Sequence, residues 1–118
     1  MSAEINVEGV DHTGIRVANP DRAVKFYAML GFEVITKVAF DPVIIIRNPQ
    51  NVEINLIVNA AEENDGSNIL MDVETKHAGI THLPLRVSSI VDTKKLLKEN
   101  AIEITQGPVN FGRHGHVT

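Results

Sequence analysis

The feature that most constrains the fold of this chain is a short stretch that occurs twice, seventy residues apart. Residues 11–17 read Asp-His-Thr-Gly-Ile-Arg-Val, and residues 81–87 read Thr-His-Leu-Pro-Leu-Arg-Val. Apolar positions continue the match on the C-terminal side of both stretches, so an internal duplication is the simplest explanation. The identities within the repeated stretch are His12 with His82, Arg16 with Arg86, and Val17 with Val87.

The first copy predicts a β-α-β-β-β unit. Its first strand covers residues 10–18, and a helix follows, because Asn19 is a favourable cap and Pro20 suits the first helical position. Gly31 is expected to end this helix. Three more runs are rich in aliphatic residues and are separated by turn-forming Asp-Pro and Asn-Pro pairs. They predict strands at residues 32–40, 43–47 and 52–58.

Alternation along the strands divides the predicted sheet into two faces. Thr13 and Ile15 face the helix, so His12 and Arg16 lie on the opposite side. The strand at 52–58 is divided in the same way, with its aliphatic residues toward the helix. Its remaining residues, and the one that follows it, share the face of His12; they are Glu53, Asn55, Ile57 and Asn59.

The second copy predicts the same beginning. A strand at 80–87 leads into a helix capped by Ser89, and another strand is expected at 102–105. After a loop at 106–112, residues 113–118 begin a further strand. The repeat places the counterpart of the 52–58 strand beyond Thr118, so the second module is expected to be incomplete. The predicted domain covers 1–118, with module one at about 9–58, an acidic linker at 59–79 and module two at 80–118.

Composition excludes several classes of function. A chain of 118 residues with 43% hydrophobic residues can bury one core, and its net charge of −4 gives nucleic acid no basic surface. The absence of cysteine excludes disulfides and thiolate metal sites. The longest aliphatic run, Val43 to Ile46, is too short to cross a membrane, and residues 1–8 do not resemble a signal peptide. We expect a cytoplasmic protein that binds neither nucleic acid nor membranes.

Two histidines at equivalent positions of the repeat suggest a metal site. His12 and His82 both project from the face opposite the helix, and pairing of the two modules about a pseudo-twofold axis would bring them together. Neutral imidazole is a good ligand for Zn²⁺, Ni²⁺ or Fe²⁺. The sequence therefore predicts that these two side chains bind one divalent ion.

The chain resembles the vicinal oxygen chelate superfamily, which includes glyoxalases, bleomycin-resistance proteins and extradiol dioxygenases. The resemblance rests on the two repeated stretches, on Asn-Pro-Asp-Arg-Ala-Val-Lys-Phe-Tyr from residue 19, on Leu-Gly-Phe-Glu-Val from residue 30, and on Gly-Pro-Val from residue 107. It implies an α+β fold in which two tandem βαβββ modules pair into a curved half-barrel. Metal and substrate would lie on the concave face.

The resemblance also implies roles for individual residues. Asn55 falls where many members have a glutamate that binds the metal, and the glutamate that ends the family's site would lie beyond Thr118. The catalytic base is therefore unassigned, and this chain is expected to hold its metal weakly. Arg16 and Asn59 match positions that bind substrate in glyoxalase I proteins, and an Arg fork suits a carboxylate. Arg86 is the counterpart of Arg16 in the repeat.

Three functions compete on this basis. The first is a metal-dependent lyase or isomerase of glyoxalase type, similar to lactoylglutathione lyase, which acts on a small oxygenated substrate. The second is an Fe²⁺ extradiol-type dioxygenase. The third is a metal-free protein of bleomycin-resistance type that binds a small molecule. Because the half-barrel needs two matched sheets and an incomplete module exposes a strand edge, a homodimer is also expected.

Overall fold

The computed structural model describes residues 4–37, 40–61, 66–107, 109–111 and 114–116. The chain divides into two compact units, Met1–Ala78 and Gly79–Thr118, which we describe separately. None of the helices in these described ranges is long and apolar enough to cross a membrane.

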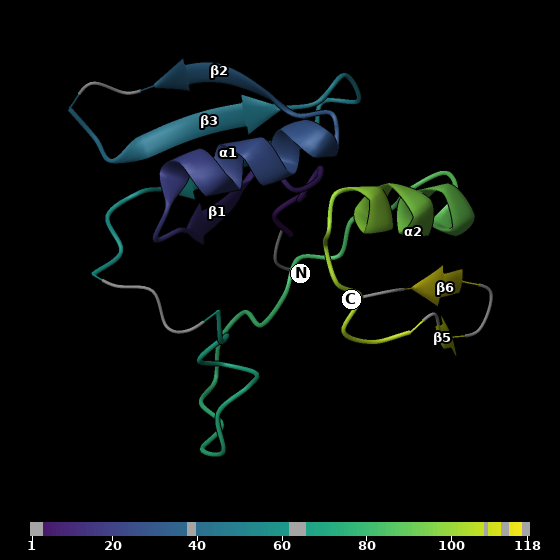
Figure 1. Cartoon of the computed structure of the whole chain (residues 1–118). Coiled ribbons are helices and arrows are strands. Elements are labelled where there is room, and N and C mark those ends of the chain that lie inside the picture. Colours follow the sequence, from purple (N-terminus) through teal and green to yellow (C-terminus); the bar gives the residue numbers. More distant parts are fainter. Residues whose placement is uncertain (1–3, 38–39, 62–65, 108, 112–113, 117–118) are drawn as a thin grey trace. The chain divides into compact units, whose positions relative to one another are not determined.

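Unit 1 contains the β-α-β-β-β unit that the first copy of the repeat predicts. Its elements form one open, curved sheet with the strand order β1-β4-β3-β2, and α1 lies across one face of that sheet (Figure 1). β1 runs parallel to β4, whereas β3 is antiparallel to both β4 and β2. The mixed α+β class is therefore confirmed. The elements are β1 (Thr13–Arg16), α1 (Pro20–Met29), β2 (Glu33–Lys37), β3 (Val43–Arg47) and β4 (Glu53–Ile57).

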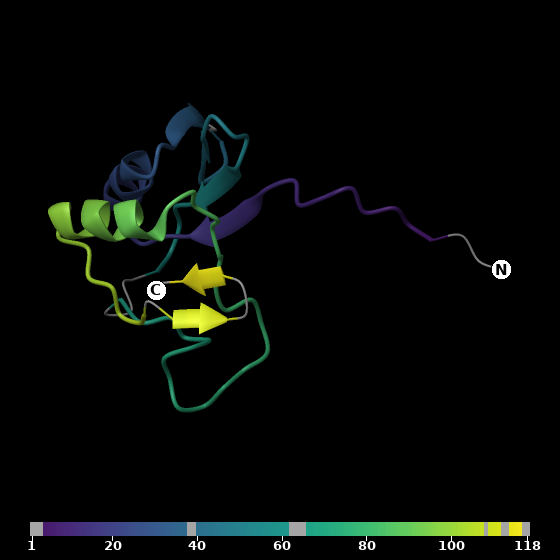
Figure 2. The same ribbon diagram turned by 90° about the vertical axis from the view of Figure 1, so that its right-hand side faces the viewer.

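Residues 4–10 precede β1 and form neither helix nor strand. Figure 2 shows them as an extended segment that runs outward from β1. All seven residues are exposed. We refer to residues 4–10 below as the N-terminal arm.

Both ends of α1 follow from the sequence. The backbone N–H of Arg22 donates to Asn19 Oδ1 at 3.0 Å, which satisfies one of the unpaired donors of the first turn. At the other end Gly31 has φ +91°, a left-handed conformation that costs glycine little. This turn lets the backbone N–H of Phe32 donate to the Tyr27 carbonyl at 3.0 Å, so the chain leaves the helix toward β2.

The core of unit 1 lies between α1 and the sheet. Ile54 and Leu56 in β4 have 0% exposed surface and Ile46 in β3 has 1%, which confirms the predicted helix-facing side of β4. Phe32 is 6% exposed, and its ring meets that of Tyr27 edge to face with centroids 5.6 Å apart. This geometry is one that aromatic pairs prefer.

The burial of Tyr27 predicts that unit 1 weakens at alkaline pH. Burial raises the pKa of the Tyr27 phenol above its ordinary value of 10.0, because the phenolate would lose its hydration. The folded protein therefore retains a proton that the unfolded chain releases. The stabilising contribution is complete below about pH 10 and is lost as the pH rises through the higher folded-state pKa.

Tyr27 is the sole tyrosine of the chain, so phenolate absorbance reports its pKa directly. We expect the folded protein to titrate at higher pH than the urea-unfolded chain. The Tyr27→Phe variant should lack the corresponding fall in free energy of unfolding. Identical titration curves for the folded and unfolded chains would contradict the prediction.

Unit 2 repeats the helix of unit 1 at the seventy-residue spacing. α2 (Ile90–Glu99) begins after Ser89, whose Oγ accepts from the Asp92 backbone N–H at 3.1 Å. α2 ends at Glu99, and Ala101 in the turn that follows has φ +58° and takes the place of Gly31. The Ile102 N–H then donates to the Leu97 carbonyl at 2.9 Å, as Phe32 does in unit 1. Helix, cap and exit turn thus match those of α1.

The strands predicted for unit 2 are wrong at three places. Residues 80–87 and 102–105 form no strand, and β5 (Val109–Phe111) lies where a loop was expected. The prediction beginning at 113 is confirmed only for β6 (His114–His116), which pairs antiparallel with β5. A strand needs a neighbour to complete its hydrogen bonds, and no described residue of unit 2 takes the place that β4 has beside β1.

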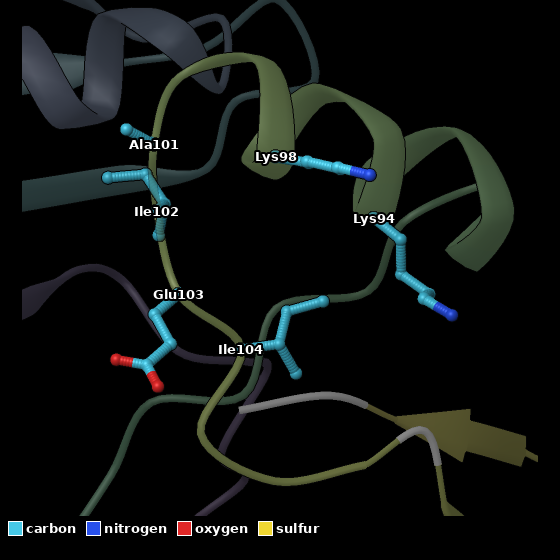
Figure 3. A pocket seen from close by; sticks show the side chains of 6 residues that line it. All are labelled: Lys94, Lys98, Ala101, Ile102, Glu103 and Ile104. Carbon is cyan, nitrogen blue, oxygen red and sulfur yellow. The ribbon is translucent and has the colours of Figure 1, made fainter.

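A hollow of about 430 Å³ lies in unit 2 between α2 and residues 101–104 (Figure 3). Its lining is mostly apolar, with Lys94, Lys98 and Glu103 at its margin. Ile102 stands here where unit 1 has the larger Phe32. None of the site residues predicted from the sequence lines this hollow.

Candidate metal centre

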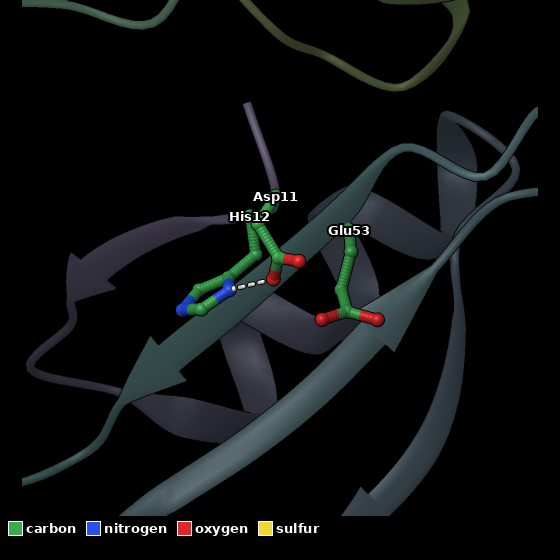
Figure 4. Close-up of side chains that lie close together, drawn as sticks. All are labelled: Asp11, His12 and Glu53. Carbon is green, nitrogen blue, oxygen red and sulfur yellow. Dashed lines mark hydrogen bonds and ion pairs between the residues drawn. The ribbon is translucent and has the colours of Figure 1, made fainter. Parts of the chain in front are cut away.

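A cluster of three metal-binding side chains lies on the helix-free face of unit 1. One possible ligand atom from each of Asp11, His12 and Glu53 lies within 4.8 Å of the other two (Figure 4). The register of the sheet explains the cluster, since Thr13 at the start of β1 is paired with Ile54 in β4. One residue earlier on both strands, His12 comes beside Glu53.

His12 and Asp11 interact directly. His12 Nδ1 lies 2.6 Å from Asp11 Oδ1, a short distance typical of a charge-assisted hydrogen bond. In Figure 4 the other ring nitrogen lies on the side of the imidazole away from Glu53. The side chain of His12 is 43% exposed and that of Asp11 is 92% exposed, so both are open to an incoming ion or ligand.

Glu53 is held by Arg47, which lies opposite it in the β3–β4 ladder. Arg47 Nη2 and Nε donate to Glu53 Oε1 at 2.5 and 3.1 Å. Both hydrogen bonds end on one carboxylate oxygen, so the second oxygen is a potential metal ligand. The Glu53 side chain is 19% exposed, and this ion pair fixes the orientation of the cluster's most buried carboxylate.

Asn55 lies one pleat further along the same face. It is paired with Gly14 of β1, so the register sets it two residues away from the position beside His12. Asn55 Oδ1 is buried and has no hydrogen-bond partner among the described residues. An acceptor in this state is costly and favours a donor or a cation nearby.

The structure brings together Arg16 and Asn59, two of the residues predicted to bind the substrate. Arg16 Nε donates to Asn59 Oδ1 at 3.2 Å, although 43 residues separate them in the sequence. Both side chains are exposed, and Arg16 lies on the same face of β1 as His12. Asn59 thus holds part of the guanidinium and leaves its other N–H groups available.

The remaining predicted residues belong to unit 2. His82 and Arg86 are exposed, and His82 Nδ1 lies 2.7 Å from the hydroxyl of Thr81. Asp11 and Thr81, the residues before the two repeated histidines, therefore make equivalent contacts. The sequence predictions did not include Asp11, although its position directly before a candidate ligand was a signal. The roles of His82 and Arg86 remain predictions.

These observations define a class of protein: a β-α-β-β-β sheet with histidine and carboxylate groups gathered on the face away from its helix. The chain matches the family model of the Glyoxalase/Bleomycin resistance protein/Dioxygenase superfamily over residues 11–118. It belongs to this superfamily, which confirms the resemblance found in the sequence.

Two solved structures are similar in fold. One is an integron cassette protein from the mobile metagenome of V. cholerae, with a TM-score of 0.64 and 21% identity, covering 96% of this chain and 84% of that one. The other comes from the mobile metagenome of V. pseudocholerae, with a TM-score of 0.64 and 20% identity, covering 96% and 83%. No match is found among curated proteins.

Proposed function

We propose that this protein binds a divalent metal ion on the helix-free face of unit 1 and acts on a small oxygenated substrate, as a lyase or isomerase of glyoxalase type. The observation that carries the proposal is the meeting of Asp11, His12 and Glu53 within 4.8 Å. Membership of the superfamily supports it.

The donor set fits a metal of this kind. One imidazole nitrogen and carboxylate oxygens are ligands that Zn²⁺, Ni²⁺ and Fe²⁺ accept. Asn55 Oδ1 on the same face is buried, has no hydrogen-bond partner in the part of the chain that the structure describes, and is a further possible oxygen ligand. His82, the equivalent of His12 in the repeat, stays a predicted ligand. When bound, the ion would supply Lewis-acid polarisation of neighbouring oxygens on the substrate.

The protein's own groups have separate tasks in this proposal. Asp11 and Glu53 offer carboxylate oxygens on the side of His12 Nδ1, and a bound ion would take the place of the Asp11–His12 hydrogen bond. Arg47 holds the Glu53 carboxylate in one rotamer through two hydrogen bonds to Oε1. Arg16, steadied by Asn59, offers a planar fork to a carboxylate of the substrate, with Arg86 as its proposed counterpart.

The proposal predicts a specific loss on changing His12. In calorimetric titration with Ni²⁺ or Zn²⁺, His12→Ala should weaken binding by at least about 10–100-fold, the range reported for residues that only support a ligand. His77→Ala is the matched control, because His77 is exposed and lies outside the cluster. Wild-type protein that binds neither ion better than His12→Ala would remove the basis of the proposal.

One observation favours a second function, a metal-free protein that binds small molecules. Arg47 already neutralises Glu53 through their ion pair, which lowers the attraction of the cluster for a cation. Arg16 on the same face is suited to an anionic ligand. The titration separates the two functions, because a metal-free binding protein would give no heat with either ion.

A further inference from the structure

Gly14 is a glycine that the fold of unit 1 does not require. It lies inside β1, is paired with Asn55 of β4 and has no positive φ, so its backbone is one that any residue adopts. A Cβ at this position would meet one side-chain atom of the described residues, Ile57 Cδ1, at an ordinary 4.0 Å. Glycine inside a strand is unfavourable, and it often marks a place where a ligand approaches the backbone closely.

The space over Gly14 forms a notch on the helix-free face. Alternation sets His12 and Arg16 on either side of Gly14, with Cα atoms about 13 Å apart along an extended strand. All three residues are exposed. The contact expected between a Cβ and Ile57 Cδ1 shows that the Ile57 side chain borders the same space. We call this space the Gly14 notch.

The chemistry of the two ends of the notch differs. At one end the guanidinium of Arg16 is held through Nε by Asn59 Oδ1 at 3.2 Å, which leaves its Nη groups for a ligand. A guanidinium binds a carboxylate with its fork and also stacks on aromatic rings. At the other end lies the carboxylate-rich cluster around His12, which repels an anion. An acidic group is therefore accepted at the Arg16 end alone.

We propose that Gly14 determines which ligand the helix-free face accepts, and that the Gly14 notch takes the aromatic ring of a carboxylic acid. The ring would lie over Gly14 against the Ile57 side chain, with its carboxylate on Arg16. The inference rests on the proposed function and deepens it, because it names aromatic acids as the class of substrate. A side chain at residue 14 would fill the space that the ring needs.

The test is a calorimetric titration with cinnamate, an aromatic carboxylate, in the presence of EDTA. The wild type should bind cinnamate, and Gly14→Val should weaken binding by about tenfold or more, the effect of changing a hydrophobic pocket by a methylene or more. Gly14→Ala should lie between the two. Gly9→Val is the matched control, because Gly9 lies in the N-terminal arm and a Cβ there would meet nothing within 4 Å.

Two further measurements keep the proposal falsifiable. The urea midpoint of Gly14→Val should equal or exceed that of the wild type, because valine favours a strand and gains a contact with Ile57. A clear fall in the midpoint would give Gly14 a structural role and overturn the proposal. Cyclohexylpropanoate, with a saturated ring on a chain of the same length, should bind more weakly than cinnamate. Equal affinity for the two acids, or unchanged cinnamate affinity in Gly14→Val, would also overturn it.

The outcome is independent of the metal proposal. EDTA removes divalent ions from the cinnamate titration, so the result depends on the Gly14 notch and Arg16 alone. Wild-type protein that binds Ni²⁺ or Zn²⁺ but not cinnamate would overturn the inference about Gly14 and leave the metal site intact. Binding of cinnamate without binding of either ion would support the notch and favour the metal-free function.

Discussion

Replacing Leu56 by alanine is expected to lower the free energy of unfolding by about 2–5 kcal/mol, the range for removing a fully buried leucine side chain. Leu56 has no exposed surface; it lies in β4 two residues from the buried Ile54 and is paired with Ile44 of β3. Because few side chains make up this core, the neighbours of Leu56 have little freedom to fill the cavity that the substitution leaves. Urea denaturation followed by circular dichroism measures the effect.

Val52→Ala is the matched control for Leu56→Ala. Val52 precedes β4 and is 38% exposed, so its truncation removes less buried surface. We expect a loss below about 1.5 kcal/mol for this variant, because a partly exposed valine loses only part of its transfer free energy. If both substitutions cost the same, the core of unit 1 does not lie where the structure places it.

The second large effect is expected at Glu53. Glu53→Gln keeps the shape of the side chain and an oxygen for Arg47, but it removes the negative charge from the proposed metal ligand. Affinity for Ni²⁺ or Zn²⁺ should fall by at least about 10–100-fold, as for other residues that support or supply ligands. Thermal unfolding of the metal-free variant checks that the Arg47 contact still holds the fold.

Asn55 provides the comparison for Glu53. The family resemblance points to Asn55 as the strand ligand, whereas the register of β1 and β4 sets Glu53 beside His12. An amide oxygen is a weaker ligand than a carboxylate, so Asn55→Ala should reduce metal affinity less than Glu53→Gln does. The reverse order would assign the ligand to Asn55 and leave Glu53 with a structural role as the partner of Arg47.

The local structure of unit 1 could be predicted from the sequence because its signals are short-range. Asn19, Pro20 and Gly31 define the helix ends through backbone hydrogen bonds within a few residues. The same holds for Ser89 at the start of α2. The strands predicted at 80–87 and 102–105 failed for the opposite reason: a strand depends on a ladder partner distant in the sequence.

The candidate site could be predicted only in part. Alternation identified which residues share the face of His12, and it included Glu53, Asn55 and Asn59. It could not show which of them lies beside His12, because that depends on the register between β1 and β4. This register brings Glu53 into the cluster and Arg16 into contact with Asn59. Asp11 lies before the start of β1, so alternation along the strand does not assign the direction of its side chain.

The sequence by itself determined the α+β class, the superfamily and the two faces of the first sheet. Each of these follows from the spacing of residues along the chain, which can be read without the tertiary structure. Tertiary structure alone decided that Arg47 holds Glu53 and, within the described ranges, that Asn55 Oδ1 lacks a partner and that β1 is the last strand of its sheet. Those depend on register and strand order, which hydrogen bonding between distant segments sets.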